Sequence, residues 1–139
     1  MPAPNLSEEE VEEVYAWVDL VPLSRPKRNI SRDFSDGVLL AETVQHFYPR
    51  LVEMHNYSAA NASAQKMYNW QTLNKKVLKR LGIVLSVKEM EEACNCAPLV
   101  VEGILLRLLH KVEADKARLD SSSGSGSRSA GAGAGAGAG

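Results

Sequence analysis

The side chains of this sequence with the clearest capacity for chemistry are two clusters of cations. The first basic cluster lies within "LSRPKRNISRDFSDG", residues 23–37, and consists of Arg25, Lys27, Arg28 and Arg32. The second basic cluster, on a predicted helix, consists of Lys75, Lys76, Lys79 and Arg80, which share one broad face in helical projection. The whole chain nevertheless has a formal net charge of −1. Cationic patches on an otherwise acidic domain create an oriented field, which favours docking onto a polyanion in one pose.

No pattern of catalysis or metal binding accompanies these clusters. The sequence has no glycine-rich phosphate loop, no His-Glu-x-x-His and no nucleophile elbow, so we expect no enzyme, no catalytic residue and no cofactor. Cys94 and Cys96 lack the usual zinc spacing, and the three histidines lie far apart in the sequence: His46, His55 and His110. We therefore expect two small apolar thiols at the end of a buried helix, and no metal site.

Composition narrows the class of protein further. With 139 residues and 45% hydrophobic content, the chain fits one globular domain and a tail. Two cysteines without a disulfide framework fit a reducing cytosolic compartment. The N-terminal segment does not read as a signal peptide, and Glu102 and Arg107 interrupt the richest apolar run, so no membrane span is expected. Nucleic acid is not an expected partner, because the domain is not basic overall and carries no nucleic-acid-binding signature.

Helical periodicity and capping patterns account for the body of the chain. Ser7 and Glu10 form a capping-box pattern at the start of the first helix, and Ser86 with Glu89 repeats it. Apolar stripes at helical spacing, with Pro and Gly breaks, predict five helices: residues 7–21, 33–48, 63–81, 86–96, and a last helix with Pro98 in its first turn. No segment alternates with period two, so the predicted fold class is all-α.

A further group of residues is expected to support the fold. Asp33 and Asp36 are predicted to cap the second helix, where Gly37 would let another element pack closely. The remaining members are three aromatic packing residues, one core leucine and a glycine that stops the third helix: Trp17, Trp70, Tyr15, Leu73 and Gly82.

The expected organisation has three parts: an N-terminal extension (residues 1–6), one helical domain (residues 7–119) and a low-complexity tail (residues 120–139). The tail, "DSSSGSGSRSAGAGAGAGAG", consists mainly of Ser, Gly and Ala and has no large apolar side chain. Such a segment cannot offset the entropy of ordering, so we predict a disordered, flexible linker.

Three stretches resemble calponin-homology domains. "DFSDGVLLAETVQHFYP" (residues 33–49) resembles the Asp-x-x-Asp-Gly-x-x-Leu helix of that fold, and "NWQTLNKKVLKRLGI" (residues 69–83) resembles its Asn-x-x-x-Leu…Leu-Gly-Ile segment. Within the superfamily, "WVDLVPLSRPKRNISRDFSDG" and "LVEMHNY" resemble the sperm-flagellar protein/CLAMP branch, over about residues 6–114. Members of that family usually continue into a C-terminal coiled coil, whereas this chain ends in Ser/Gly/Ala repeats.

The resemblance implies a function as well as a fold. Proteins of this branch associate with microtubules, so we expect a non-catalytic microtubule-binding module in the cytoplasmic cytoskeleton of cilia or flagella, in the axoneme and its central apparatus. The eight cations of the two basic clusters would dock onto acidic tubulin surfaces, and other axonemal proteins would be further partners. Actin filaments are the alternative filament, although actin-binding calponin domains commonly occur as tandem pairs. A scaffold that uses an apolar surface and contacts no filament is the other alternative.

Overall fold

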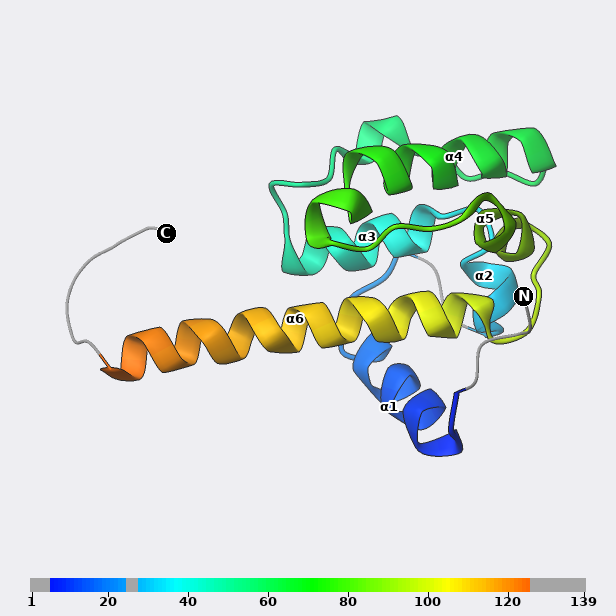
Figure 1. The fold of residues 1–139 in the computed structure, drawn as a ribbon. Helices are drawn as coiled ribbons and strands as arrows, with labels where there is room; N and C mark the ends of the chain where they lie inside the picture. Colours follow the sequence, from blue (N-terminus) through cyan, green and yellow to red (C-terminus); the bar gives the residue numbers. More distant parts are fainter. Residues whose placement is uncertain (1–5, 25–27, 126–139) are drawn as a thin grey trace. The chain divides into compact units, whose positions relative to one another are not determined.

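The structure of the chain is a computed structural model that describes residues 6–24 and 28–125. All regular structure in these residues is helical, which confirms the all-α fold class. The elements, seen in Figure 1, are α1 (Glu8–Val18), α2 (Ile30–Asp33), α3 (Val38–Phe47), η1 (Met54–Asn56), α4 (Ser63–Lys76), η2 (Leu78–Leu81), α5 (Val87–Cys94) and α6 (Val100–Ser125), η1 and η2 being 3-10 helices. The chain divides into two compact units, residues 1–109 and 110–139, and the division falls inside α6.

The two capping boxes begin α1 and α5 as predicted. At α1 the Glu10 backbone N–H donates to Ser7 Oγ at 3.1 Å, and the Ser7 backbone N–H donates to Glu10 Oε1 at 2.9 Å. Ser86 and Glu89 repeat both bonds at α5, each at 3.0 Å. Reciprocal bonds of this kind satisfy backbone donors that the first helical turn leaves unpaired.

The helix predicted from Asp33 to Tyr48 is two helices, and Asp33 does not cap the longer one. Asp33 is the last residue of the short helix α2, and its Oδ2 accepts hydrogen bonds from the backbone N–H groups of Arg28 and Asn29 at 2.7 and 2.9 Å. The helix is interrupted because Gly37 adopts φ +81°, a left-handed conformation. Gly37 is the N-cap residue of α3, and the Asp36 Oδ1 accepts from the backbone N–H of Val38, the first residue of α3, at 3.0 Å.

Helix α4 packs closely against Gly37. A Cβ added at Gly37 would lie 3.2 Å from Leu73 Cδ1 and 3.5 Å from Asn69 Cβ. The Trp70 indole Nε1–H donates to the Ser35 carbonyl at 2.8 Å, and both Trp70 and Leu73 are fully buried. The missing side chain at Gly37 therefore lets two core side chains of α4 reach the backbone that precedes α3.

A second aromatic contact joins α1 to the end of α3. Trp17 is buried and its ring stacks on Phe47, with centroids 5.0 Å apart and planes 9° from parallel. Tyr15 differs from the prediction, because it is 41% exposed and uses its hydroxyl, which donates to Glu102 Oε2 on α6 at 3.0 Å.

The third predicted helix breaks before its last turn. Val77 has φ −121° and ψ −63°, so α4 ends at Lys76 and the chain continues as η2. Val77, Leu78 and Leu81 are all buried, and the 3-10 geometry places Leu78 and Leu81, which are three residues apart, on one face. Gly82 ends η2 with φ +78°, as predicted for a helix-stopping glycine.

The last helix starts later and ends later than predicted. Leu99 has φ +69° and its carbonyl accepts from the Gly103 N–H at 3.0 Å, so α6 begins at Val100 and Pro98 lies before its first turn. The apolar stripe of α6 is buried as predicted: Val101, Ile104, Leu105, Leu108 and Val112. The helix reaches Ser125, past residue 119 where the sequence predicts the domain to end. Residues 126–139 of the predicted linker lie outside the described residues.

Truncating the buried indole should destabilise the domain strongly. We expect Trp70→Ala to lower the free energy of unfolding by about 3 to 5 kcal/mol, since it opens a large cavity and leaves the Ser35 carbonyl without its donor. Thermal melts followed by circular dichroism measure the loss. An unchanged melting temperature would contradict the burial of Trp70.

The two left-handed glycines provide a matched pair. Gly82→Ala should lose about 1 to 2 kcal/mol through backbone strain alone, because nothing lies within 4 Å of an added Cβ. Gly37→Ala should lose more, since the same strain is joined by the approach to Leu73 Cδ1. Urea denaturation of the two variants measures the difference. Equal losses in the free energy of unfolding would show that α4 can move away from an added Cβ at Gly37 without cost.

Candidate functional site

The second basic cluster is exposed at the end of α4. Lys75 and Lys76 occupy the last turn of α4, and Lys79 and Arg80 lie on η2; all four side chains are exposed. Cations at a helix C-terminus are favoured there by the helix dipole. The sequence predicts one continuous helical face for these cations, but the helix breaks at Val77. All four cations are nevertheless exposed to solvent.

This cluster borders a cleft that the sequence analysis did not identify. The cleft has a volume of about 470 Å³, and its lining includes Lys75, Lys76 and Arg80 together with Arg50 and Tyr57. Arg50 is an exposed cation just after Pro49, in the connection between α3 and η1. Its position in the sequence gives no signal of this role, because only the fold brings it to α4. Glu53 also lines the cleft, so its positive charge is not uniform.

Tyr57 adds a neutral hydrogen-bonding group to the cleft. Burial, followed by the charge of Glu53 and the neighbouring Tyr68, raises the pKa of Tyr57 to about 12. Its phenol therefore stays protonated at physiological pH, and its O–H remains available as a donor. The cleft is lined by three cations from α4 and η2, by the cation of Arg50 and by a phenol. Such a lining is suited to binding carboxylate groups.

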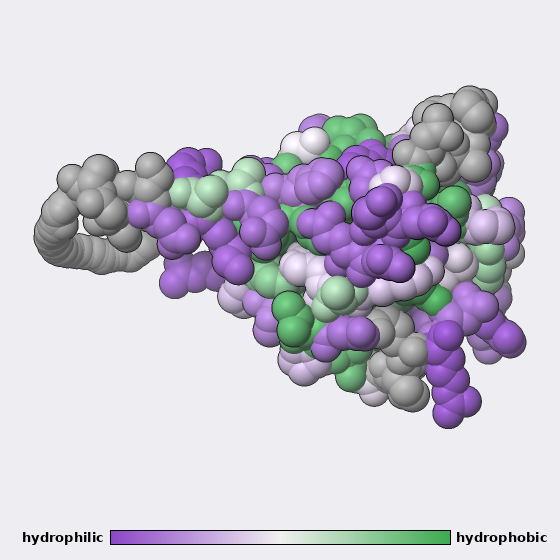
Figure 2. Space-filling model, turned by 90° about the horizontal axis from the view of Figure 1, so that it is seen from below, coloured by the Kyte–Doolittle hydropathy of each residue, from purple (hydrophilic) through white to green (hydrophobic). Residues whose placement is uncertain are grey.

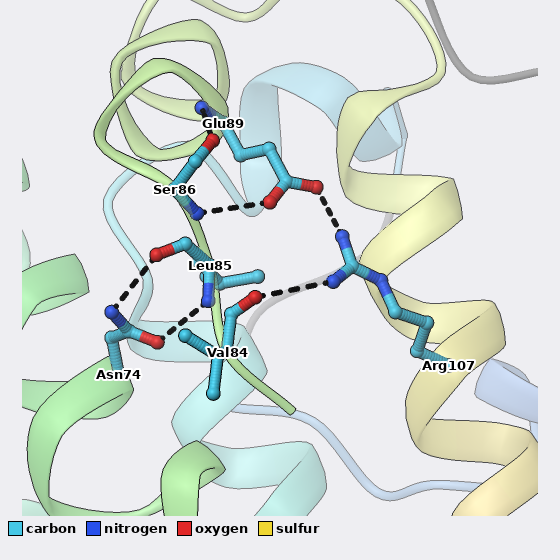
Figure 3. Close-up of polar contacts among 6 residues, drawn as sticks. All are labelled: Asn74, Val84, Leu85, Ser86, Glu89 and Arg107. Carbon is cyan, nitrogen blue, oxygen red and sulfur yellow. Dashed lines mark hydrogen bonds and ion pairs between the residues drawn. The ribbon is translucent and has the colours of Figure 1, made fainter. Parts of the chain in front are cut away.

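Side-chain bonds from two helices hold the chain that follows η2 (Figure 3). Asn74 on α4 makes two bonds to Leu85: its Nδ2 donates to the Leu85 carbonyl at 3.1 Å, and its Oδ1 accepts from the Leu85 N–H at 2.8 Å. Arg107 on α6 donates to the Val84 carbonyl at 3.5 Å and forms an ion pair with Glu89 on α5. The connection that follows η2, the helix of Lys79 and Arg80, is thus held by α4 at Leu85 and by α6 at Val84.

Only part of the first basic cluster lies in the described residues. Arg25 and Lys27 fall outside them, whereas Arg28 and Arg32 are exposed beside and on α2. The flanking chain is anchored on both sides. On one side the Ser24 backbone N–H donates to Glu42 Oε1 on α3 at 2.8 Å, and on the other the Asp33 carboxylate accepts from the Arg28 and Asn29 N–H groups. The sequence analysis missed Glu42, since nothing local connects it to the loop.

The structure does not bring the described members of the two clusters together. Arg28 and Arg32 belong to the α2 end of the first unit, beside α5 in Figure 1, whereas η2 lies at the opposite end of α4. Two cationic surfaces separated in this way can contact two separate acidic groups, and they do not form one continuous patch.

The other sequence-predicted chemistry can be checked in the described residues. Cys94 is buried, and burial raises the pKa of its thiol, so it is a weak nucleophile. The ranges 6–24 and 28–125 contain no group of three His, Cys, Asp or Glu side chains placed to hold a metal ion. In the same part of the chain, no helix combines the length and apolarity that crossing a membrane requires.

Figure 2 shows one face of the molecule, on which an apolar docking surface, expected for the scaffold alternative, can be looked for. On this side of the molecule hydrophilic residues dominate, and the hydrophobic ones form small separate patches. Isolated apolar side chains are normal on a protein surface and do not indicate a partner. On the face that Figure 2 presents, the visible described residues therefore offer charge more than an extended apolar surface.

The fold is that of a helical domain of the calponin-homology type. The family model described as "CH-like domain in sperm protein" matches residues 14–110, and the chain belongs to this family. This membership confirms the calponin-homology resemblance and its sperm-flagellar protein/CLAMP branch.

Curated relatives agree with the family. The chain is 50% identical to sperm flagellar protein 1 of Homo sapiens over 116 residues, which are 84% of this chain and 49% of that protein. It is 51% identical to sperm flagellar protein 1 of Xenopus laevis over 117 residues, covering 84% and 51% of the two chains. The Bos taurus protein of the same name is 48% identical over 116 residues, or 84% and 49%. The chain therefore spans about half the length of these relatives.

The Asn74 bonds give a prediction about the frame of the second basic cluster. Asn74→Ala should destabilise the domain by about 1 to 3 kcal/mol, because it leaves the N–H and carbonyl of the buried residue Leu85 without partners. Gln71→Ala, at an exposed position of the same helix, is the control and should change stability by less than about 0.5 kcal/mol. Urea unfolding followed by tryptophan fluorescence compares them. Equal stability of the two variants would show that the Leu85 bonds do not hold the connection.

Proposed function

We propose that this domain is a non-catalytic microtubule-binding module of cilia or flagella, which docks onto acidic tubulin surfaces through its two basic clusters. At the coarser level, the calponin-homology family and the relatives named sperm flagellar protein support a cytoskeletal role and a flagellar or ciliary localisation. The family is structural and cytoskeletal, which supports a role without catalysis.

The observation that carries the proposal is the cationic cleft at the end of α4. Lys75, Lys76 and Arg80 border it with Arg50, and the first three stand on elements held by buried residues of the core. Carboxylates form their strongest hydrogen bonds with charged donors, and arginine can bind one with two parallel bonds. Glutamate-rich surface segments of a filament would supply such carboxylates. Because the cations are placed before binding, little entropy is lost when they meet the partner.

The first basic cluster supplies the second contact in this proposal. Arg28 and Arg32 are exposed at the other end of the first unit, and Arg25 and Lys27 adjoin them in the sequence. A partner that meets both clusters must present acidic groups at two separate places. A repeating filament surface meets that requirement more readily than a single acidic peptide does. Actin filaments and other axonemal proteins are the competing partners, and the experiment below compares the two filaments.

Charge reversal tests the two clusters separately. The double variants Lys76→Glu/Arg80→Glu and Arg28→Glu/Arg32→Glu should each weaken co-sedimentation with microtubules about tenfold or more, which is about 1.4 kcal/mol. Both should keep the wild-type melting temperature, since exposed charges contribute little to stability. Raised salt should weaken wild-type binding and narrow the gap to each variant, because salt screens exposed charges.

A third double variant controls for net charge. Lys116→Glu/Arg118→Glu makes the same change in charge at two exposed positions outside both clusters, and we expect it to pellet like the wild type. Actin filaments serve as the second substrate under identical conditions. Failure of the wild type to pellet with microtubules, or stronger pelleting with actin, would refute the proposed function. Normal pelleting by a folded double reversal would remove that cluster from the interface.

A further inference from the structure

Glu102 presents a buried carboxylate oxygen that has no partner. The residue lies on α6 and is only 4% exposed. Its Oε2 accepts the hydrogen bond from the Tyr15 hydroxyl at 3.0 Å. Its Oε1 is the one buried side-chain nitrogen or oxygen in the described residues that forms no hydrogen bond. Buried polar atoms are normally satisfied, so the Glu102 carboxylate retains capacity to accept a further hydrogen bond.

Glu102, the residue that carries this oxygen, also lines a pocket. The pocket measures about 460 Å³ and is formed between α1, α2 and the start of α6, and all of its lining residues lie in the first unit. Its lining consists of Tyr15, Arg28, Asn29, Ile30, Ser31 and Glu102. One carboxylate, one phenol, one apolar side chain and polar groups at the α2 start thus surround a space that a single side chain could enter.

The chemistry of the lining side chains identifies the kind of group that fits the pocket. A carboxylate only accepts hydrogen bonds, and it binds ammonium and guanidinium groups most strongly. The Tyr15 hydroxyl is already used on Oε2, and burial, with the hydrogen bond to Glu102, raises the pKa of Tyr15, so the phenol keeps its proton. The Tyr15 ring and Ile30 offer apolar surface for an alkyl stem.

We propose that this pocket receives a lysine or arginine side chain of the protein partner, with its charged end on the Glu102 carboxylate. Arg28 in the lining favours a cation that has an acidic neighbour over a free cation, because the neighbour would pair with Arg28. Basic side chains with acidic neighbours are typical of protein surfaces. The proposal rests on the proposed function, since the partner surface is the one that contacts the first basic cluster.

A titration of the whole 139-residue chain tests the pocket without any filament. The probe is the lysine analogue N-acetyl-Lys-Glu-amide, whose cation has an acidic neighbour, and binding is followed by the NMR shifts of the Tyr15 ring and of the Asn29, Ile30 and Ser31 amides. We expect saturable shifts at these groups, and none with N-acetyl-norleucyl-Glu-amide, which lacks the ammonium group. Spermidine, a free polycation, should bind more weakly than the lysine analogue. Shifts that do not saturate, or spermidine binding as tightly as the analogue, would overturn the proposal.

Two variants link the shifts to Glu102. Glu102→Gln keeps the shape of the side chain and should weaken analogue binding about tenfold or more, while Glu113→Gln, an exposed charge change on the same helix, should match the wild type. Ser31→Arg places a cation of the chain itself in the pocket and should block the analogue without altering Glu102. Since Glu102→Gln removes an unpaired buried charge, its melting temperature should equal or exceed that of the wild type. Wild-type binding of the analogue by both variants would refute the site.

Microtubule co-sedimentation then separates this proposal from the proposed function. Glu102→Gln should pellet several times more weakly than Glu113→Gln at equal thermal stability. If the wild type fails to pellet, the proposed function fails, while the analogue titration still decides whether the pocket binds a basic side chain. If the wild type pellets and Glu102→Gln pellets equally well, the pocket is not part of the filament contact and the proposal is wrong.

Discussion

The approach of α4 to the turn before α3 is the constraint on which the first unit depends. Gly37 adopts a left-handed backbone there, and an added Cβ would lie 3.2 Å from Leu73 Cδ1. From the same helix, the Trp70 indole donates to the Ser35 carbonyl and the Asn69 amide donates to the Asp36 carbonyl, both at 2.8 Å. The carbonyls that the interrupted helix leaves unpaired are therefore satisfied by α4. One glycine permits both the break in the chain and the contact that compensates for it.

The position of α4 in turn determines where the cations stand. With Trp70 and Leu73 locked in the core, Lys75 and Lys76 must emerge at the end of the helix, and the break at Val77 carries the chain into η2. Asn74 then fixes Leu85, and Arg107 reaches Val84 from α6. Arg50 arrives from the other side, on the connection after α3. Buried apolar contacts thus determine the geometry of a cleft whose charges are exposed. Charge reversal in the cleft can therefore change binding without loss of the fold.

The features that could be predicted from the sequence are those that depend on residues close together in the chain. The capping boxes at Ser7 and Ser86 and the stop at Gly82 depend on neighbours within one turn, so the sequence identifies them correctly. Asp33 was assigned to the wrong helix because the conformation of Gly37 is decided by contact with α4, which no local pattern encodes. Arg50 and Glu42 gain their roles from elements distant in the sequence. Glu102 reads in the sequence as an interruption of an apolar run, and only its burial reveals an unpaired oxygen.

Two kinds of charge coexist in this domain, and they suit different stages of binding. The basic clusters are exposed, so their attraction acts at distances of about a Debye length, roughly 8 Å at physiological salt, and steers a polyanion without fixing its register. Glu102 is buried, so its attraction is weakly screened but acts only on a group that enters the pocket. A surface that is acidic overall would be drawn to the clusters in many alignments. A basic side chain beside an acidic one on that surface would meet Glu102 in few of them, and alignments that lack this contact are weaker, which disfavours wrong registers.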